Sequence, residues 1–387
     1  MSTSYTPKPR AQQTFTKPQD GDNKDVASIN IAVEGLADSD ARTHLAEAME
    51  WGPAITTAKD VVRGAYSLKE QSWFTVGPGA NDFLLRSQDS GRSWVDLSGT
   101  IGVDDALSTY DIAINAAGQA VIINVGTQDI YESAYGGYAG FAFSTSAGVL
   151  NAAMTAGQII FEEVNDLWLA LYRTTGSGMR ADTSPNRTAW TNQTLPAGWA
   201  AYNNSTQNPR VAANDAGRIV ALFYDDTALN LKYRFAYSTD GGVNWTAGTA
   251  LTPGFGPATD CVSKPTYDPD FDDWYFCAAE TTGTNSTEVY RSEDGGATWS
   301  IVYSNINTDN YAFVAIAWFN GVLVASNIGG RIFFSTDRGV TWKLATRNLL
   351  NGACRPWLSV GNGQLLVIDD TDNVSYVTRR LGAVGGG

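Results

Sequence analysis

The chain has 387 residues, of which 40 are acidic and 26 basic, so its formal charge at pH 7 is −14. With 43% hydrophobic residues it is too apolar to be disordered, and its acidity argues against nucleic acid as a partner. No apolar stretch approaches the roughly 18 residues of a membrane span or forms the core of a signal peptide, so we expect synthesis in a cytoplasm, no signal peptide and no membrane insertion.

The first fifty residues lack the strand-and-turn rhythm of the rest of the chain. Three prolines fall within the first eighteen residues, which favours an extended arm. Residues 38–50 are predicted to form one short helix, because Asp38 or Ser39 can cap it, an apolar stripe follows, and a Gly-Pro pair ends it. The alternatives for residues 1–50 are a frayed tail with a packing helix and an arm that docks on other subunits.

One eight-residue pattern, Ser-x-Asp-x-Gly-x-(Ser/Thr/Asn)-Trp, recurs four times between short apolar runs. Two degenerate copies, beginning at Ser144 and Thr183, give a recurrence of about 50 residues, the period of four-stranded propeller blades. In such a turn the Asp accepts backbone N–H groups, the Gly supplies a positive φ, and the Trp returns apolar surface to the core. The shared residues are Ser87, Asp89, Gly91, Trp94, Ser238, Asp240, Gly242, Trp245, Ser292, Asp294, Gly296, Trp299, Ser335, Asp337, Gly339 and Trp342.

This pattern resembles the Asp-box, or BNR repeat, of sialidase-like β-propellers. In that family the box forms the turn between the third and fourth strands of a blade, far from any active site. The resemblance covers residues 51–380 and departs at Asn244, where Thr is usual, and in the two degenerate copies. We carry the box over as a structural element, which implies an all-β propeller.

The apolar runs group into seven blades, of which the last has only three strands. A sheet that lacks its outer strand leaves an open edge, and residues 52–58 are placed to supply that strand. We therefore predict a seven-bladed β-propeller over residues 51–387, closed by residues 52–58 pairing with the last blade. The expected blades are 51–97, 104–150, 157–195, 209–251, 264–303, 311–349 and 354–380.

Few residues in the ring suit catalysis or metal binding. His44 is the only histidine and lies in the predicted helix, so a Ser–His–Asp device or a histidine metal site in the ring is excluded. Residues 268–273 have the carboxylate spacing of a calcium loop but lack its Gly and its final Glu, and a turn between strands is preferred. Cys261, Cys277 and Cys354 show no zinc spacing and are expected as free thiols, with a bridge between Cys261 and Cys277 as the alternative.

A sialidase of the resembled family needs three arginines around a substrate carboxylate, a tyrosine with a glutamate, and an acid/base aspartate. The family's Arg-Ile-Pro sequence is missing here. Arg63, Arg210 and Arg355 each lie near the start of a blade's first strand, and whether they form a degenerate sialidase-like site is left open. A glycosidase pair of carboxylates has candidates by type alone. These are Glu162, Asp225 and Glu280. We expect no catalytic residue, no metal and no cofactor.

The face opposite the Asp boxes carries the long loops. Aromatic residues there stand among Gly, Asn and Ser, a composition that suits stacking on sugar rings or contact with a partner protein. The alternative is that these aromatics cover the ends of the blades. The candidate ligand contacts are Tyr131, Tyr135, Tyr138, Phe141, Trp199 and Tyr202.

The N-terminal segments Thr14–Asp22, Ala27–Asn30 and Glu34–Asp38 resemble those that precede a variable host-facing domain in bacteriophage and prophage tail-associated proteins. That resemblance implies a non-enzymatic virion protein (tail, tail fibre or spike), anchored to other virion proteins through residues 1–50. We expect a homo-oligomer in the particle and contact with a host-surface glycan or protein through the loops. A glycan-cleaving, sialidase-like or other Asp-box glycoside hydrolase is the alternative, and an intracellular assembly factor the third possibility. Ligand, copy number and symmetry stay open.

Overall fold

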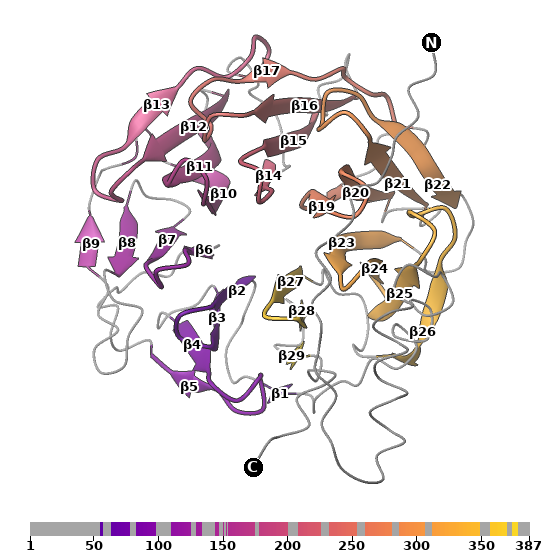
Figure 1. The fold of residues 1–387 in the computed structure, drawn as a ribbon, viewed down its shortest axis with the longest axis horizontal. Coiled ribbons are helices and arrows are strands. Elements are labelled where there is room, and N and C mark those ends of the chain that lie inside the picture. Colours follow the sequence, from indigo (N-terminus) through magenta and orange to yellow (C-terminus); the bar gives the residue numbers. More distant parts are fainter. Residues whose placement is uncertain are drawn as a thin grey trace, which may run out of the picture.

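The computed structural model describes residues 55–56, 63–77, 83–97, 110–124, 129–133, 144–146, 150, 152, 154–174, 178–199, 208–225, 232–253, 260–280, 286–305, 312–348, 357–369 and 374–377. Every regular element in these ranges is a β-strand, and none of them contains a helix that could span a membrane. The expected arm, residues 1–50, and its helix over residues 38–50 lie outside the described residues. The fold of the described part is an all-β propeller (Figure 1).

Six blades are each built from consecutive strands in antiparallel order. The first three contain β2 (Arg63–Ser67), β3 (Ser72–Gly77), β4 (Phe83–Ser87) and β5 (Val95–Asp96); β6 (Tyr110–Ile114), β7 (Ala120–Asn124), β8 (Ile130–Ser133) and β9 (Ser144–Ser146); and β10 (Met154–Glu162), β11 (Leu167–Thr174), β12 (Gly178–Ser184) and β13 (Thr191–Gln193). The next three contain β14 (Arg210–Ala213), β15 (Ile219–Asp225), β16 (Lys232–Ser238) and β17 (Thr246–Ala247); β18 (Asp260–Val262), β19 (Thr266–Asp268), β20 (Asp273–Glu280), β21 (Thr287–Ser292) and β22 (Ser300–Asn305); and β23 (Phe313–Phe319), β24 (Val322–Asn327), β25 (Arg331–Ser335) and β26 (Lys343–Asn348).

A further sheet among the described strands combines the two ends of the ring. Its order is β1-β29-β28-β27, where β1 is Ile55–Thr56, β27 is Trp357–Gly361, β28 is Gln364–Asp369 and β29 is Val374–Val377. Ile55 pairs with Ser375 and Thr56 with Val374 in antiparallel register. The seven strand groups expected from the sequence are therefore distributed as six blades of consecutive strands and one composite sheet, and β1 occupies the outer edge of that sheet.

The Asp box at Ser292 shows how the repeat sequence makes its turn. The Ser292 Oγ donates to Asp294 Oδ1 (2.8 Å) and accepts the Gly296 N–H (2.8 Å). Thr298 donates its N–H to Asp294 Oδ1 (2.8 Å) and its hydroxyl to Oδ2 (2.6 Å), while the Trp299 indole donates to the Gly296 carbonyl (3.2 Å). Burial alone would raise the pKa of Asp294, but the bonds from Thr298 and Ser292 outweigh it and lower that pKa.

The boxes that begin at Ser87, Ser238 and Ser335 repeat the bonds of the Ser and Asp side chains. The indole bond to the Gly carbonyl recurs at Trp245 and Trp342. In the second of these boxes Asn244, where the resembled family has Thr, donates its side-chain amide to Asp240 Oδ2 at 2.6 Å. The departure from the usual residue therefore leaves the turn intact.

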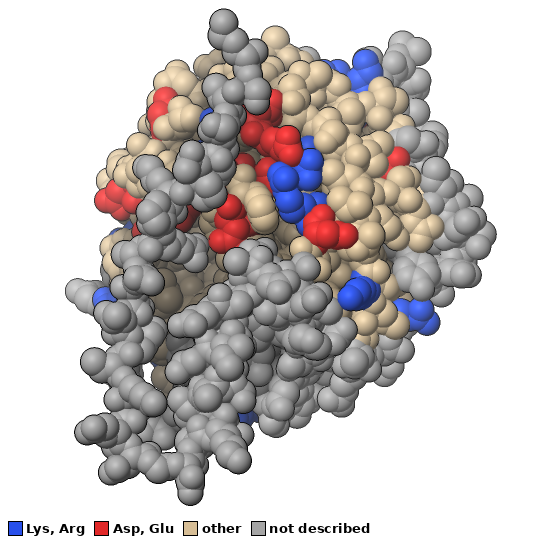
Figure 2. All heavy atoms as spheres, turned by 45° about the vertical axis from the view of Figure 1, so that its right-hand side comes forward, with Lys and Arg blue, Asp and Glu red and all other residues tan. Residues whose placement is uncertain are grey.

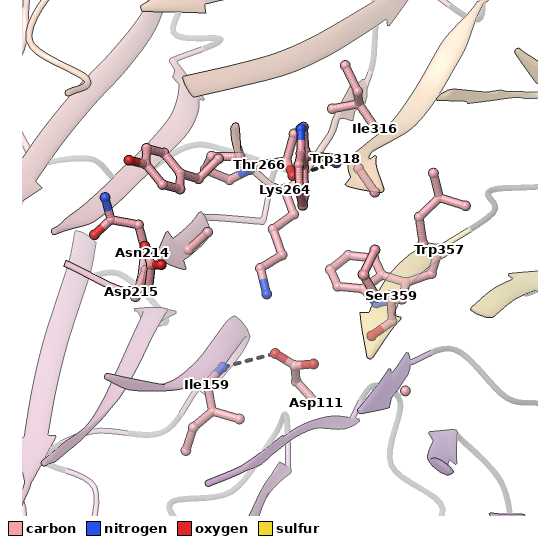
Figure 3. A pocket seen from close by; sticks show the side chains of 18 of the residues that line it. Asp111, Ile159, Asn214, Asp215, Lys264, Thr266, Ile316, Trp318, Trp357 and Ser359 are labelled. Carbon is pink, nitrogen blue, oxygen red and sulfur yellow. Dashed lines mark hydrogen bonds between the residues drawn. The ribbon is translucent and has the colours of Figure 1, made fainter. Parts of the chain in front are cut away.

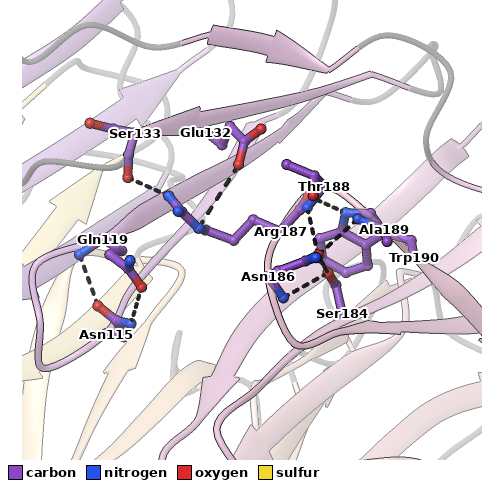
Figure 4. A network of polar contacts seen from close by, with 10 residues as sticks. All are labelled: Asn115, Gln119, Glu132, Ser133, Ser184, Asn186, Arg187, Thr188, Ala189 and Trp190. Atoms are coloured by element: carbon purple, nitrogen blue, oxygen red, sulfur yellow. Dashed lines mark hydrogen bonds and ion pairs between the residues drawn. The ribbon is translucent and has the colours of Figure 1, made fainter.

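The two degenerate copies depart from the sequence prediction. The second copy begins at Ser184 and not at Thr183, because Ser184 and Asn186 take the places of the usual Ser and Asp. Asn186 Oδ1 accepts the N–H groups of residues 188 and 189 (Figure 4). Arg187 adopts the positive φ of 70° that a glycine usually supplies, and its carbonyl accepts the Trp190 indole (2.6 Å). The expected copy at Ser144 is no box turn, since residues 144–146 form the outer strand β9.

Side chains of the box turns also join adjoining blades. The Arg187 guanidinium donates to the Ser133 carbonyl at 2.8 Å, and Arg338 donates to Asp273 on the neighbouring blade at 2.5 Å (Figure 4 for Arg187). Gly296, with φ 92°, packs so closely on Val220 of the preceding blade that a Cβ would lie 2.8 Å from Cγ2. The glycine is required there by both backbone conformation and inter-blade contact.

Candidate functional site

A cavity of about 360 Å³ lies at the centre of the ring. The inner strand of each sheet contributes to its wall, which places the cavity on the propeller axis (Figure 3). Those contributions are Gly64, Asp111, Ile159, Ala212, Thr266, Ala317 and Ser359. Segments that are remote in sequence therefore meet here only because the ring closes.

Asp111 is a buried carboxylate in this wall, with 7% of its surface exposed. It stands in the apolar inner strand β6, and its Oδ2 accepts the Ile159 N–H from the next blade at 2.9 Å. Burial raises the pKa of Asp111, against the opposing attraction of Arg63 and Lys264. The fold thus holds this acid where its charge is disfavoured.

Lys264 reaches into the same cavity from a break in an inner strand. It lies between β18 and β19, where Pro265 has no N–H to give to a ladder. Its half-buried side chain points its Nζ toward the Asp111 carboxylate (Figure 3). Burial lowers the pKa of Lys264; Asp111 raises it, and the positive charges of Arg63 and Arg210 lower it further.

The two opposite charges do not touch. Among the described residues, the ion pairs within 4.0 Å include neither Lys264 nor Asp111. Each group faces the cavity with bonding capacity left, because an ammonium has three donors and a carboxylate accepts more than one hydrogen bond. The space between them is therefore bordered by one group of each charge.

Two of the three arginines noted in the sequence meet beside the cavity. The Arg63 Cζ lies 4.1 Å from the centroid of the Trp357 ring, and the Arg210 Cζ lies 5.8 Å from it. Arg210 Nε also donates to the Val262 carbonyl at 3.0 Å. Arg355 lies outside the described residues, so the expected trio is represented by a pair gathered on one tryptophan.

The cavity reaches the end of the ring that carries the Asp boxes. Its outer lining includes Asp215 and Pro269, in the turns between the first and second strands of their blades, and these turns share an end with the boxes in an antiparallel meander. Asp215 and Pro269 are exposed, as is Val360 at 42%. This entrance lies opposite the loops in which the sequence placed the ligand contacts.

The predicted loop aromatics do not form one surface in the described part. Tyr131 is 2% exposed and packs in the core between the first two blades, while Trp199 is 2% exposed and packs edge-on against Phe223 at 4.7 Å. Because both side chains are buried, neither is available to a ligand. A position close to a Gly-rich loop does not prevent a side chain from pointing into the core. Tyr135, Tyr138, Phe141 and Tyr202 lie outside the described residues.

The carboxylates noted by type serve mainly as turn and ion-pair residues. Glu162 is fully buried and accepts N–H groups of residues 164 and 165 (2.7 and 2.9 Å), and Asp225 pairs with Arg234 at 2.6 Å. Glu280 ends β20, and its backbone N–H donates to the Ser286 carbonyl. Residues 269–272 form the expected turn, and within the described ranges no cluster of His, Cys, Asp and Glu could hold a metal. Cys277 is buried and forms no disulfide.

Charges of both signs share the outer surface near these blades. In the view of Figure 2, basic and acidic side chains adjoin one another on the described surface. The contacts include Arg291–Glu293 at 2.7 Å and Arg338–Glu293 at 3.0 Å. The net negative charge of the chain therefore forms no single-sign surface in this view.

Sequence reasoning missed Asp111 and Lys264. Each had a signal: a lone Asp within the apolar run Tyr110–Ile114, and a Lys-Pro step at the start of the expected fifth blade. Charged residues in strands that line a ring are rarely placed there without a partner or a role. Their pairing across the axis had no signal in the sequence.

The comparisons with known proteins agree with this fold. A family model described as BNR/Asp-box repeat matches residues 236–247, which contain the second box. No curated protein matches the chain. The structure of YCF48 bound to D1 peptide covers 85% of this chain and 96% of its own, with TM-score 0.58 and 13% identity.

Two further solved structures are similar. A catalytically inactive virginiamycin B lyase from Staphylococcus aureus with quinupristin has TM-score 0.61 and 12% identity, covering 84% of this chain and 98% of its own. YCF48 from Cyanidioschyzon merolae has TM-score 0.57 and 14% identity, covering 85% and 98%. At these identities the likeness shows the β-propeller fold alone.

Proposed function

We propose that the chain is a non-enzymatic structural protein of a phage virion: a tail, tail fibre or spike protein. Residues 1–50 anchor it to other virion proteins, and the propeller contacts the host surface. The resemblance of the N-terminal segments supports the virion role, and the closed ring supports a rigid binding module. Repeated copies in a particle raise the effective concentration of individually weak sites.

The observation that favours binding over hydrolysis is the arrangement of charge on the axis. A glycosidase needs two carboxylates flanking one bond, about 5 Å apart or somewhat wider. The cavity instead sets one deep carboxylate, Asp111, among the positive charges of Lys264, Arg63 and Arg210. Glu162 and Asp225 are engaged in structural bonds. This arrangement suits recognition of a charged group.

Mass spectrometry of purified particles tests the virion role. We expect the chain as a stoichiometric component, and its absence from particles would favour the intracellular assembly factor. Hydrolysis of a fluorogenic glycoside panel by the purified chain would contradict the non-enzymatic role and favour the glycan-cleaving alternative.

Host contact is tested on the loops opposite the Asp boxes. Replacement of Tyr135, Tyr138 and Phe141 by Ala together is expected to reduce adsorption of particles to host cells at least tenfold. Phe271→Ala, at a 47% exposed aromatic on the Asp-box face, is the matched control and should leave adsorption unchanged. Equal adsorption of wild type and both variants would contradict host contact through these loops.

A further inference from the structure

Lys264 and Asp111 form an unused pair of opposite charges on facing walls of one cavity. They come from blades on different parts of the ring, point toward one another, and are not within ion-pair distance (Figure 3). A direct salt bridge would have satisfied both groups at once. Held apart, each retains capacity for a ligand atom that lies between them.

The neighbouring arginines act on both members of this pair. The charges of Arg63 and Arg210 repel that of Lys264, and the charge of Arg63 also attracts the Asp111 carboxylate. On the opposite wall Asp111 is the acceptor, fixed in place by the Ile159 N–H. A bound anion would relieve the repulsion among three cations, and a bound cation would relieve the desolvated carboxylate.

The remaining lining sets the size and character of the ligand. Tyr267, Trp318 and Trp357 line the cavity together with small aliphatic residues. Aromatic walls accept a compact apolar or ring-shaped body, and about 360 Å³ lies near the lower end of the usual range for small-molecule sites.

We propose that the axial cavity binds a compact zwitterion, a ligand that carries an ammonium and a carboxylate on one centre, such as an α-amino acid. The ligand's ammonium donates to Asp111, its carboxylate accepts from Lys264, and its side chain lies along the aromatic wall. This assignment rests on the proposed binding role of the ring and adds the chemical class of the ligand. The zwitterion can be a free amino acid or the same group displayed at the end of a surface polymer.

Calorimetric titration of the purified full chain with a panel of free amino acids of both hands tests the assignment. For each amino acid that binds, its N-acetyl derivative keeps only the carboxylate and its amide keeps only the ammonium. We expect the parent to bind at least tenfold more tightly than either derivative. Nε-acetyl-lysine retains both α groups with a blocked far end. If Nε-acetyl-lysine binds as tightly as free amino acids, the group at the end of a surface polymer is the favoured ligand. If Nε-acetyl-lysine alone fails to bind, a free amino acid is the favoured ligand.

Two variants assign the ends of the ligand. Asp111→Asn should weaken the parent amino acid at least tenfold and leave the N-acetyl derivative unchanged, whereas Lys264→Met should weaken the parent and leave the amide unchanged. Lys69→Met and Asp166→Asn alter exposed charges in turns outside the cavity and are the matched controls. Circular dichroism at pH 7 verifies that each variant is folded.

Several outcomes would overturn the assignment. These are no binding by any amino acid of the panel at millimolar concentration, an N-acetyl derivative that binds as tightly as its parent, or variants that bind like wild type. Failure of the virion role is separate, because particle composition is measured without the ligand. A chain that is absent from particles but binds zwitterions keeps this site and loses only its proposed setting.

Discussion

The Lys264 ammonium and the Asp111 carboxylate face each other across the propeller axis, and burial works against the charge on both. Sites that keep charged groups partly desolvated for a ligand commonly cost stability in the ligand-free protein. Removing either charge is therefore expected to stabilise the fold while it damages binding.

Asp111→Asn should raise the free energy of unfolding at pH 7. The amide oxygen can still accept the Ile159 N–H, so the change chiefly removes the charge. The folded-state pKa of Asp111 is raised, so its ionised form costs stability above that pKa, and the cost vanishes below the unfolded value of about 3.9. Urea unfolding at pH 7 and pH 3.5 measures this. A gain at pH 7 that persists undiminished at pH 3.5 would contradict the electrostatic explanation.

Lys264→Met should also stabilise the protein at neutral pH. The pKa of Lys264 is lowered in the fold, so its charged form costs stability below that pKa, and the cost vanishes above the unfolded value of about 10.4. Since the two charges attract, the double variant should gain more than the sum of the single gains, with a coupling of about 0.5–3 kcal/mol. Unfolding of the four proteins in one double-mutant cycle measures the coupling; strict additivity would mean that Lys264 and Asp111 do not interact.

The Asp-box turns were predictable because their bonds are local. Ser292, Asp294, Gly296 and Thr298 satisfy one another within seven residues, so the sequence pattern alone carries the geometry. The degenerate copy was misplaced by one residue because it is shorter: Ser184 and Trp190 are six positions apart, whereas the Ser and Trp of each intact box are seven apart.

The axial site was not predictable, because its residues meet only when distant blades close the ring. Nothing near Lys264 in sequence indicates that Asp111 lies opposite. Tyr131 and Trp199 were misjudged for a related reason: a strand end or loop position does not say on which side of the blade an aromatic ring packs. Burial is decided by the neighbouring blade, which a local pattern does not contain.

Gly296→Ala should lower the free energy of unfolding by about 2–5 kcal/mol. Its φ of 92° disfavours any Cβ by about 1–2 kcal/mol, and the Cβ would lie 2.8 Å from Val220 Cγ2, with about 1–3 kcal/mol of overpacking. Gly363→Ala is the matched control, since Gly363 has φ 68° and a Cβ added there would meet nothing within 4 Å. Chemical denaturation should show only the backbone component for Gly363; equal losses at both sites would rule out the inter-blade contact.

The Asp boxes should set the acid limit of the propeller. Partial burial alone would raise the pKa of each box aspartate, but hydrogen bonds from the box residues lower that pKa. The stability that the ionised aspartates contribute is therefore present above about pH 4 and is lost as pH falls through their folded-state pKa. Changing Asp89, Asp240, Asp294 and Asp337 together to Asn should keep the fold at pH 7, because Asn186 already closes a box turn with an amide oxygen. The variant should be less stable than wild type at pH 7 and lose less stability between pH 5 and pH 2. Thermal unfolding across that range, with Asp166→Asn as the control, measures the slope; a slope equal to that of wild type would show that other carboxylates set the acid limit.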